Sequence, residues 1–537
     1  MSRGLLRIPQ LRDQLQRHFA LVLLGVGLLL LLTNLGNIYL WQDEAETALL
    51  SQRLRQYGLP LAFDGRNLIR QAPMDVQYTE DWVWIYHPWL PFYFTAVSFA
   101  FLGQTTFAAR LPFALAGLAT VLLLYYSVRR HFRNQALAML GSSLLLFCIP
   151  FLLHARQCKY FPFAALFTVA VLDAYLLLIH SDSRLARPYL IVAGFCLFQS
   201  NFGAFLPTFA GLGLHFLLQR PTGRQFRRVL APLVLLVVLA VPWAIYLQTW
   251  ARGRFVFDIY RFVGHLVHYA VYVTGWVFPW PLILAFGFCA VSQRMWVGRQ
   301  RQILGLYVAV IGITIPFLSA TFIWMYFSYI VQLVPLLMVI LAATILQLAR
   351  RSRVLAWALT VLVVATNLLH LFPYVLPASR SFKWASLAPR AYLAETDALI
   401  ASAGNPRSDL AGYLYELTHD YDGPDEGVAL FLREQAKPED VVVANYGELP
   451  ILFYTDLDIA GGLAAYRIGE VSNPEWIVDR IAGPYREEMA KLLASGDYEP
   501  ITIPYADILW GNRPVPEYHK FATVSGPPYV IVHRRLN

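Results

Sequence analysis

Long apolar segments separated by short arginine clusters recur through residues 19–372, and they constrain the fold of this chain more than any other feature. A helix needs about 20 mostly apolar residues to cross the hydrocarbon core of a membrane. Only 14% of the residues are charged, whereas soluble domains have about 25%. This pattern excludes a soluble enzyme, a disordered chain and a fibrous protein. It predicts a mostly α-helical, polytopic membrane bundle.

The arginine clusters predict an orientation, because cytoplasmic loops of membrane proteins carry an excess of Lys and Arg. Four arginines precede the first apolar run, so the N-terminus is expected in the cytoplasm. The run 89–103 is short and is interpreted as an interfacial or re-entrant helix on the outer side. About eleven crossings then satisfy the charge rule and place the C-terminus outside. The predicted spans are 19–40, 111–128, 135–153, 161–180, 189–200, 203–218, 229–249, 270–291, 303–320, 325–348 and 354–372.

The stretch 189–218 allows two interpretations. Two short helices joined at Asn201-Phe202-Gly203 form a hairpin, whereas one long tilted helix reverses the orientation of everything that follows. We favour the hairpin, because basic loops flank the stretch on both sides. Asp173 lies inside the fourth span, and we interpret it as a hydrogen-bond partner between helices, although an intramembrane carboxylate is also a functional candidate.

Acidic residues divide the chain into two predicted domains. Residues 1–378 hold eleven of the 34 Asp and Glu residues, seven of them between residues 43 and 81, and residues 379–537 hold the rest. We expect a transmembrane catalytic domain over 1–378 with an outer loop at 41–88, and a soluble extracytoplasmic α/β domain over 379–537. Within the second domain, Val441–Ala444 and Tyr529–Val532 are typical of buried strands.

The first candidate for chemistry is the pair Asp43-Glu44, at the outer end of the first span. Two adjacent carboxylates at a membrane boundary can supply a general base or a metal ligand. The alternative is a solvated helix terminus, since acidic residues are favoured in a first helical turn. Aromatic residues crowd the loop that follows, either as the rim of a cleft or as an interfacial belt.

The second candidate is the segment His154–Tyr160, which the predicted topology places outside. Arg156 and Lys159 suit a phosphate group, because arginine binds it through a fork of donors and lysine as a point charge. The alternative is a pair of side chains that snorkel at helix ends. Further outer-side cations and ring nitrogens together suggest a pocket that accepts an anion, although each singly is more often structural. These residues are His87, Arg110, Arg252, Arg254, Arg261, His265 and His268.

Other site types have no support in the sequence. The four cysteines show no zinc-ligand spacing, and the chain contains no P-loop, no GxGxxG after a strand and no HExxH. A nucleotide-driven pump is therefore not supported, and the positive net charge does not indicate nucleic acid as a partner, because the arginines lie between the apolar runs.

Taken together, the DE pair, the outer loop, the short helix after His87-Pro88 and the segment Gly103-x5-Ala109-Arg110-Leu111-Pro112 resemble the GT-C glycosyltransferases. The resemblance points to the branch of protein O-mannosyltransferases and the lipid A aminoarabinose transferase, in bacteria. The segments His154–Tyr160 and Tyr326–Pro335 resemble the corresponding outer loop and late helix. The tail segments Phe453-Tyr454-Thr455 and Trp510–Pro514 resemble the extracytoplasmic domains of bacterial relatives.

The resemblance implies an enzyme of the bacterial inner membrane that transfers a hexose or pentose from a polyprenyl-phosphate donor to a lipid, polysaccharide or protein. Asp43 is then the catalytic base and Glu44 its support. Arg156, Lys159, His87 and Tyr160 are expected to hold the donor phosphate, with Arg110, Arg261 and Tyr326 around the pocket. No cofactor follows with certainty, and a divalent cation stays open. Two other functions are a transporter or flippase for lipids or solutes and a non-catalytic membrane scaffold.

Overall fold

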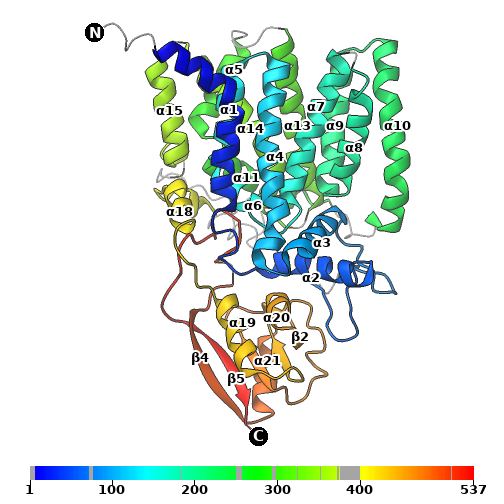
Figure 1. Cartoon of the computed structure of the whole chain (residues 1–537), viewed down its shortest axis with the longest axis vertical. Coiled ribbons are helices and arrows are strands. Elements are labelled where there is room, and N and C mark those ends of the chain that lie inside the picture. The colour runs from blue at the N-terminus through cyan, green and yellow to red at the C-terminus, as the bar shows by residue number, and fades with distance from the viewer. Residues whose placement is uncertain are drawn as a thin grey trace.

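A computed structural model of the chain shows a helical bundle with a small mixed α/β region at one end (Figure 1). The first helix, α1 (Arg7–Leu32), begins at the opposite end of the bundle from the sheet. The structure describes residues 7–71, 76–181, 183–249, 257–292, 298–322, 324–350, 352–371, 374, 399–509 and 511–536. The predicted domain boundary at 378/379 lies outside the described residues. So does Trp510, which belongs to a segment that carries the resemblance.

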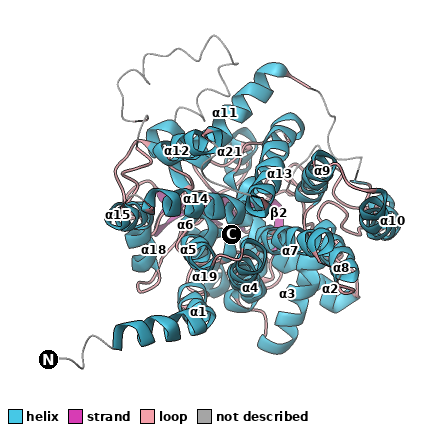
Figure 2. Ribbon diagram, turned by 90° about the horizontal axis from the view of Figure 1, so that it is seen from above, coloured by secondary structure: helices cyan, strands magenta, loops and turns pink. Residues whose placement is uncertain are grey.

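Five helices among the described residues are long and apolar enough to cross a membrane. Each coincides with one predicted span. They are α4 (Thr106–Phe132), α7 (Phe161–His180), α10 (Gly223–Tyr246), α13 (Arg299–Thr321) and the continuous segment of η2 (Phe327–Leu333) with α14 (Val334–Ala349). Figure 2 shows α14 enclosed by other helices and α10 at the periphery.

Two further predicted spans are bent helix pairs. The first joins α5 (Gln135–Leu146) to α6 (Ile149–Ala155) at 64°, and the second joins α11 (Ile259–Trp276) to α12 (Trp280–Val291) at 101°. A proline lies at the second position of α6 and of α12, which favours a new helix start because proline lacks an N–H donor. With these pairs, the described part of the chain contains up to seven candidate spans by length and composition.

The other predicted spans are shorter apolar helices, so eleven crossings are not confirmed. They coincide with the apolar part of α1 and with α8 (Ala186–Phe198), α9 (Phe202–Leu218) and α15 (Arg353–Ala365). The break between α8 and α9 confirms the hairpin. Asn201 caps α9 through its side chain, and the two helices lie side by side in Figure 1.

Asp173 links two helices, as predicted. Its carboxylate accepts a hydrogen bond from Arg130 at 3.2 Å and pairs with the His131 ring nitrogen at 2.8 Å, so that it fastens α7 to the last turn of α4. A buried carboxylate between apolar helices needs such partners, because an unpaired charge in this environment is costly.

Two helices lie across the sheet-side end of the bundle: α2 (Gln42–Tyr57) and α3 (Leu90–Leu102) (Figure 1). They pack against each other, and α3 also packs on α4. The helix α2 ends at Gly58, whose φ of 78° lies in the left-handed region that glycine adopts at low cost. The short helix α3 falls within the run that the sequence assigns to an interfacial or re-entrant helix.

The C-terminal region forms a five-stranded sheet in the order β2-β1-β3-β5-β4. The strand β1 (Val441–Ala444) pairs in parallel with β2 (Asp458–Gly461) and β3 (Trp476–Asp479), whereas β5 (Tyr529–Arg535) pairs antiparallel with β3 and with β4 (Tyr498–Ala506). The segments Val441–Ala444 and Tyr529–Val532 are therefore strands, as predicted. The accompanying helices are α18 (Asp409–Glu416), α19 (Pro424–Gln435), α20 (Glu448–Thr455) and α21 (Arg486–Ala494).

This region is joined to the bundle through α20, which packs on α2. The Tyr454 hydroxyl accepts a hydrogen bond from the Leu40 N–H at 2.9 Å, and it lies 2.7 Å from the Thr106 hydroxyl. The Asn67 side chain donates to the Leu457 carbonyl at 3.0 Å and accepts from the Ile459 N–H at 2.9 Å. The start of α2 is therefore held between the helical bundle and the C-terminal region.

Candidate functional site

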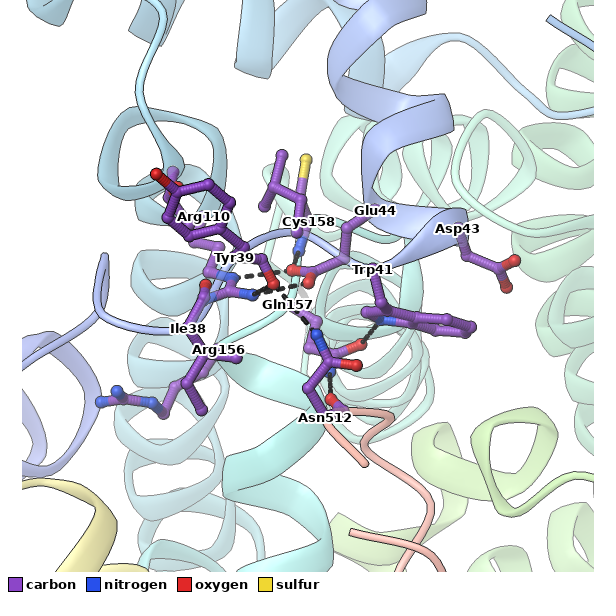
Figure 3. Close-up of polar contacts among 12 residues, drawn as sticks. Ile38, Tyr39, Trp41, Asp43, Glu44, Arg110, Arg156, Gln157, Cys158 and Asn512 are labelled. Atoms are coloured by element: carbon purple, nitrogen blue, oxygen red, sulfur yellow. Dashed lines mark hydrogen bonds and ion pairs between the residues drawn. The ribbon is translucent and has the colours of Figure 1, made fainter. Parts of the chain in front are cut away.

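The first turn of α2 carries both predicted acidic residues. Asp43 and Glu44 follow Trp41, where negative charge is stabilised by the free N–H groups of a helix start. The Trp41 indole donates to the Gln157 side-chain oxygen at 2.9 Å, which fixes this end of α2 to the loop after α6. The two acidic residues nevertheless have different surroundings (Figure 3).

Glu44 is fully buried and enclosed by hydrogen-bond donors. The Arg110 guanidinium donates to its two oxygens at 2.8 and 2.6 Å, and the Cys158 N–H donates at 2.8 Å. Arg110 also donates to the carbonyls of Leu35 and Ile38 at 3.1 and 2.8 Å. The pair Glu44–Arg110 therefore joins α2, α4 and the segment after α1. The structure thus places Arg110, which the sequence assigns to the surroundings of the pocket, in this hydrogen-bond network.

Asp43 is half-buried, and its carboxylate points away from the Glu44 network in Figure 3. Across the residues that the structure describes, no hydrogen bond or ion pair ends on this carboxylate. Two cations nevertheless interact with it electrostatically: the Lys159 ammonium and the Arg513 guanidinium. A carboxylate in such a setting can accept a proton from a reacting group.

Glu46, one turn after Asp43, is the centre of a buried charge cluster. One of its oxygens lies 2.8 Å from the Lys159 ammonium and 3.0 Å from a His87 ring nitrogen, and the other accepts from the Gln71 amide at 2.6 Å. Burial raises the pKa of Glu46, but the charges and hydrogen bonds of Lys159 and His87 outweigh it and lower that pKa to about 2.

Lys159 ties this cluster to Asp43. Its ammonium also donates to the Asp43 carbonyl at 3.3 Å, and it is buried. Burial lowers the pKa of Lys159, but the negative charges of Glu46 and Asp43 outweigh this and raise it above its ordinary value. The sequence interpretation missed Glu46. The available signal was the spacing of three residues between Asp43 and Glu46, which places both on one side of a helix.

Aromatic residues complete the cluster. The Tyr160 ring lies 5.4 Å from the His87 ring, and the Lys159 ammonium lies 5.9 Å from the Tyr160 ring centroid. The Tyr329 ring, on η2, lies 5.7 Å from the Tyr326 ring. The structure therefore brings His87, Lys159 and Tyr160 together around Glu46, and their binding of a phosphate stays a prediction.

Arg156 donates to backbone carbonyls at the end of α1, and its predicted binding of the donor phosphate stays a prediction. One guanidinium nitrogen donates to the carbonyls of Leu30, Leu31 and Thr33 at 3.1, 3.3 and 2.8 Å, and another donates to the Asn34 carbonyl at 3.1 Å. These carbonyls close the C-terminal end of α1, where helix carbonyls lack intrahelical partners. The structure assigns Arg156 a helix-capping role, and its side chain points away from Asp43 (Figure 3).

Arg261 lies in the first turn of α11, after the capping residue Asp258. There it interacts with His265 on the same helix. It belongs to a different helix from the cluster around Glu46, and its predicted place at the pocket stays a prediction.

Arg513 comes from the C-terminal region, and the sequence interpretation did not place it at the site. Its guanidinium lies 4.1 Å from the centroid of the Tyr326 ring and 5.3 Å from that of the Trp41 ring. The neighbouring Asn512 amide donates to the Tyr39 carbonyl at 3.0 Å, and the Gln157 amide donates to the Asn512 carbonyl at 3.3 Å. Because Asp43 and Arg513 stand near opposite ends of the chain, no local pattern links them.

The carboxylates of the site do not form a ready metal-ligand set. Glu44 and Glu46 are each occupied by cations, and the described residues contain no group of three or more His, Cys, Asp and Glu side chains that could hold a metal ion. A divalent cation stays an untested expectation.

Residues 86–246 match the family model of dolichyl-phosphate-mannose-protein mannosyltransferases. Over 96% of the chain, the fold is similar to that of ArnT from Cupriavidus metallidurans bound to undecaprenyl phosphate, with a TM-score of 0.58, 14% sequence identity and coverage of 98% of that protein. The apo state of ArnT gives a TM-score of 0.57 and 16% identity at the same coverage. The comparison with curated proteins gives no match. The chain therefore resembles the GT-C glycosyltransferases, in sequence over residues 86–246 and in fold along almost its whole length, with ArnT as a structural counterpart.

Proposed function

We propose that this protein is a membrane glycosyltransferase that takes a sugar from a polyprenyl-phosphate-linked donor. The proposal is supported by the match of residues 86–246 to a dolichyl-phosphate-mannose-dependent family and by the likeness in fold to ArnT, which binds undecaprenyl phosphate. The acceptor class stays open between a lipid, a polysaccharide and a protein.

The observation that carries the proposal is the half-buried carboxylate of Asp43, held one turn from the buried Glu46 cluster and within electrostatic reach of two cations. Transfer of a sugar with inversion needs a base that removes the proton of the acceptor and a stabilised leaving group. Asp43 supplies the base. Lys159 stabilises the phosphate, which takes the electron pair of the glycosidic bond as that bond breaks.

The other residues are assigned roles around this base. Glu44 and Arg110 hold the first turn of α2, because each is buried and hydrogen-bonded to the other. Lys159 positions Asp43 through the backbone carbonyl and supplies positive charge. His87, Tyr160, Tyr326 and Arg261 are proposed to line the donor pocket.

We place the transfer on the outer face of a bacterial inner membrane. This assignment rests on the distribution of arginine, which predicts a cytoplasmic N-terminus, eleven crossings and an extracytoplasmic C-terminal domain over residues 379–537. In that orientation, α2 and the Asp43 carboxylate lie at the outer face of the inner membrane, between the bundle and the C-terminal region.

The test is the substitution Asp43→Asn, which keeps the size of the side chain and removes the base. We expect the release of polyprenyl phosphate from a panel of polyprenyl-phosphate sugars, with a membrane extract as the acceptor source, to fall by at least about a hundredfold, as for a general base. Polyprenyl phosphate is a product whatever the sugar and acceptor are. Thermal unfolding in detergent shows whether the variant is folded.

The matched control is Asp81→Asn, the same change at an exposed position of the outer loop. It should release polyprenyl phosphate at the wild-type rate. Near-wild-type turnover in the folded Asp43→Asn variant would refute the base assignment, and no turnover with any donor in the wild type would count against the proposed function.

A further inference from the structure

The C-terminal region reaches into the candidate site through residues 511–519. Besides the contacts of Asn512 with Tyr39 and Gln157, the Tyr272 hydroxyl on α11 donates to the Glu517 carboxylate. The His519 ring lies 2.6 Å from the Glu416 carboxylate, in a buried pair. The segment is thus fastened to the bundle on both sides of Arg513.

Arg513 lies between two aromatic side chains that belong to the bundle. Tyr326 follows α13 along the chain, and Trp41 precedes α2. A planar guanidinium on aromatic faces is held in a defined orientation, and Arg513 also hydrogen-bonds with the Tyr326 side chain. Through the contact with Trp41, Arg513 lies beside the start of α2, and its charge interacts with the Asp43 carboxylate.

The charges of the site show what this additional cation does. Arg110 is paired with Glu44, and Lys159 is paired with Glu46. Arg513 offsets the remaining carboxylate, Asp43. A base that must remain ionised beside an incoming phosphate needs such a cation, because two anions within a few ångströms repel each other strongly in a partly buried site.

We propose that Arg513 binds the phosphate of the lipid-linked donor, so that the C-terminal region forms part of the donor site and is more than a cover over it. This inference rests on the proposed function and adds to it a phosphate-binding residue from the far end of the chain. Arg513 takes the role that the sequence suggested for Arg156, whose donors are directed to the carbonyls at the end of α1.

The test compares Arg513→Gln with the wild type in binding undecaprenyl phosphate, measured by native mass spectrometry of the full chain in detergent. The neutral alcohol undecaprenol and inorganic phosphate are the other two probes. Loss of a hydrogen bond to a charged group weakens binding by roughly ten- to hundredfold. We expect that loss for undecaprenyl phosphate and unchanged binding of undecaprenol, because only the phosphate contacts Arg513. If the wild type binds inorganic phosphate but not undecaprenyl phosphate, Arg513 belongs to an anion site that takes no lipid, and the proposal is overturned.

The matched control is Arg534→Gln. Arg534 is an exposed arginine of the same region that also lies over a tryptophan, 5.8 Å from the Trp476 ring centroid, and its removal changes the net charge equally. It should bind undecaprenyl phosphate as the wild type does. Equal affinity in Arg513→Gln and the wild type would overturn the inference and leave the proposed function standing. A wild type that prefers undecaprenyl phosphate no more than ordinary phospholipid would count against both.

A second measurement needs no variant and covers the case in which Arg513→Gln does not fold. Undecaprenyl phosphate should slow hydrogen exchange of the backbone amides in residues 511–519 of the wild type, and undecaprenol should not. Equal exchange with and without undecaprenyl phosphate in that segment would overturn the proposal.

Discussion

Adjacent residues of the same chemical class have opposite roles at the start of α2. Glu44 is buried and saturated by Arg110 and the Cys158 N–H, whereas the Asp43 carboxylate faces away from these donors. A helix separates neighbouring side chains by about 100° around its axis, so one residue can anchor the turn while the next one serves the site. The distinction depends on which neighbours the tertiary fold supplies.

At the same scale, Lys159→Met tests how Glu46 is kept ionised. The low pKa of Glu46, about 2, means that its stabilising contribution is present above its ordinary pKa of 4.5 and is lost only as the pH falls toward 2. Without Lys159, burial should raise that pKa above 4.5. The melting temperature of the variant should then rise as the pH is lowered from 8 to 5. In the wild type, Glu46 contributes no such rise.

At the scale of the element, the C-terminal end of α1 is stabilised by hydrogen bonds from side chains in other parts of the chain. Four carbonyls at its C-terminal end accept from Arg156, and the Leu30 carbonyl also accepts from the Tyr413 hydroxyl at 2.7 Å. Arg156→Met should therefore lower the melting temperature by several degrees, since the carbonyls lose charge-assisted donors. Affinity for undecaprenyl phosphate in the folded fraction should stay within about twofold of the wild type; a loss as large as that expected for Arg513→Gln would return Arg156 to the phosphate site.

The elements themselves were largely predictable, because helix length, apolar composition and charge at the ends are local properties. The spans at α4 and α7, the break near Asn201 and the strand β1 all follow from such patterns. The bends between α5 and α6 and between α11 and α12 were not predicted. Pro150 and Pro281 mark where α6 and α12 begin, but the angle between the helices of each pair depends on packing.

The site was predicted less completely, for a physical reason. Asp43, His87 and Lys159 were named from ionisable groups in outer segments, which a single segment reveals, and Tyr160 was named from the resemblance to the GT-C glycosyltransferases. The capping role of Arg156 and the approach of Arg513 depend on contacts between residues far apart in the sequence. A basic residue has the same appearance in a sequence whether it binds carbonyls, a ring or a phosphate.

At the scale of the whole molecule, the contact between the C-terminal region and α2 includes a buried carboxyl group whose protonation depends on pH. Glu448, at the start of α20, accepts from the Gln42 amide at 2.5 Å and from the Leu463 N–H at 3.2 Å. The turn after β2 needs glycine here, because Gly462 has a φ of 69° and a Cβ would lie 2.1 Å from the Glu448 carboxyl carbon. Burial raises the pKa of Glu448 to about 7.

The sign of the pH effect follows from this raised pKa. The folded protein holds a proton on Glu448 that the unfolded chain, with a pKa near 4.5, has already lost, so the contribution to stability is full below 4.5 and is lost as the pH rises through 7. Glu448→Gln keeps the acceptor oxygen and carries no charge. It should melt at a higher temperature than the wild type at pH 8 and at a similar one at pH 5. A difference between the two proteins that does not depend on pH would contradict the assignment.

The position of Arg513 has a consequence for the order in which a functional protein is made. A ribosome produces Asp43 long before Arg513, and β5, which pairs with both β3 and β4, comes later still. The bundle can enter the membrane helix by helix while the site beside Asp43 lacks its last cation. If Arg513 binds the donor phosphate as proposed, a nascent chain halted before residue 511 should bind undecaprenyl phosphate roughly ten- to hundredfold more weakly than a chain that includes Arg513.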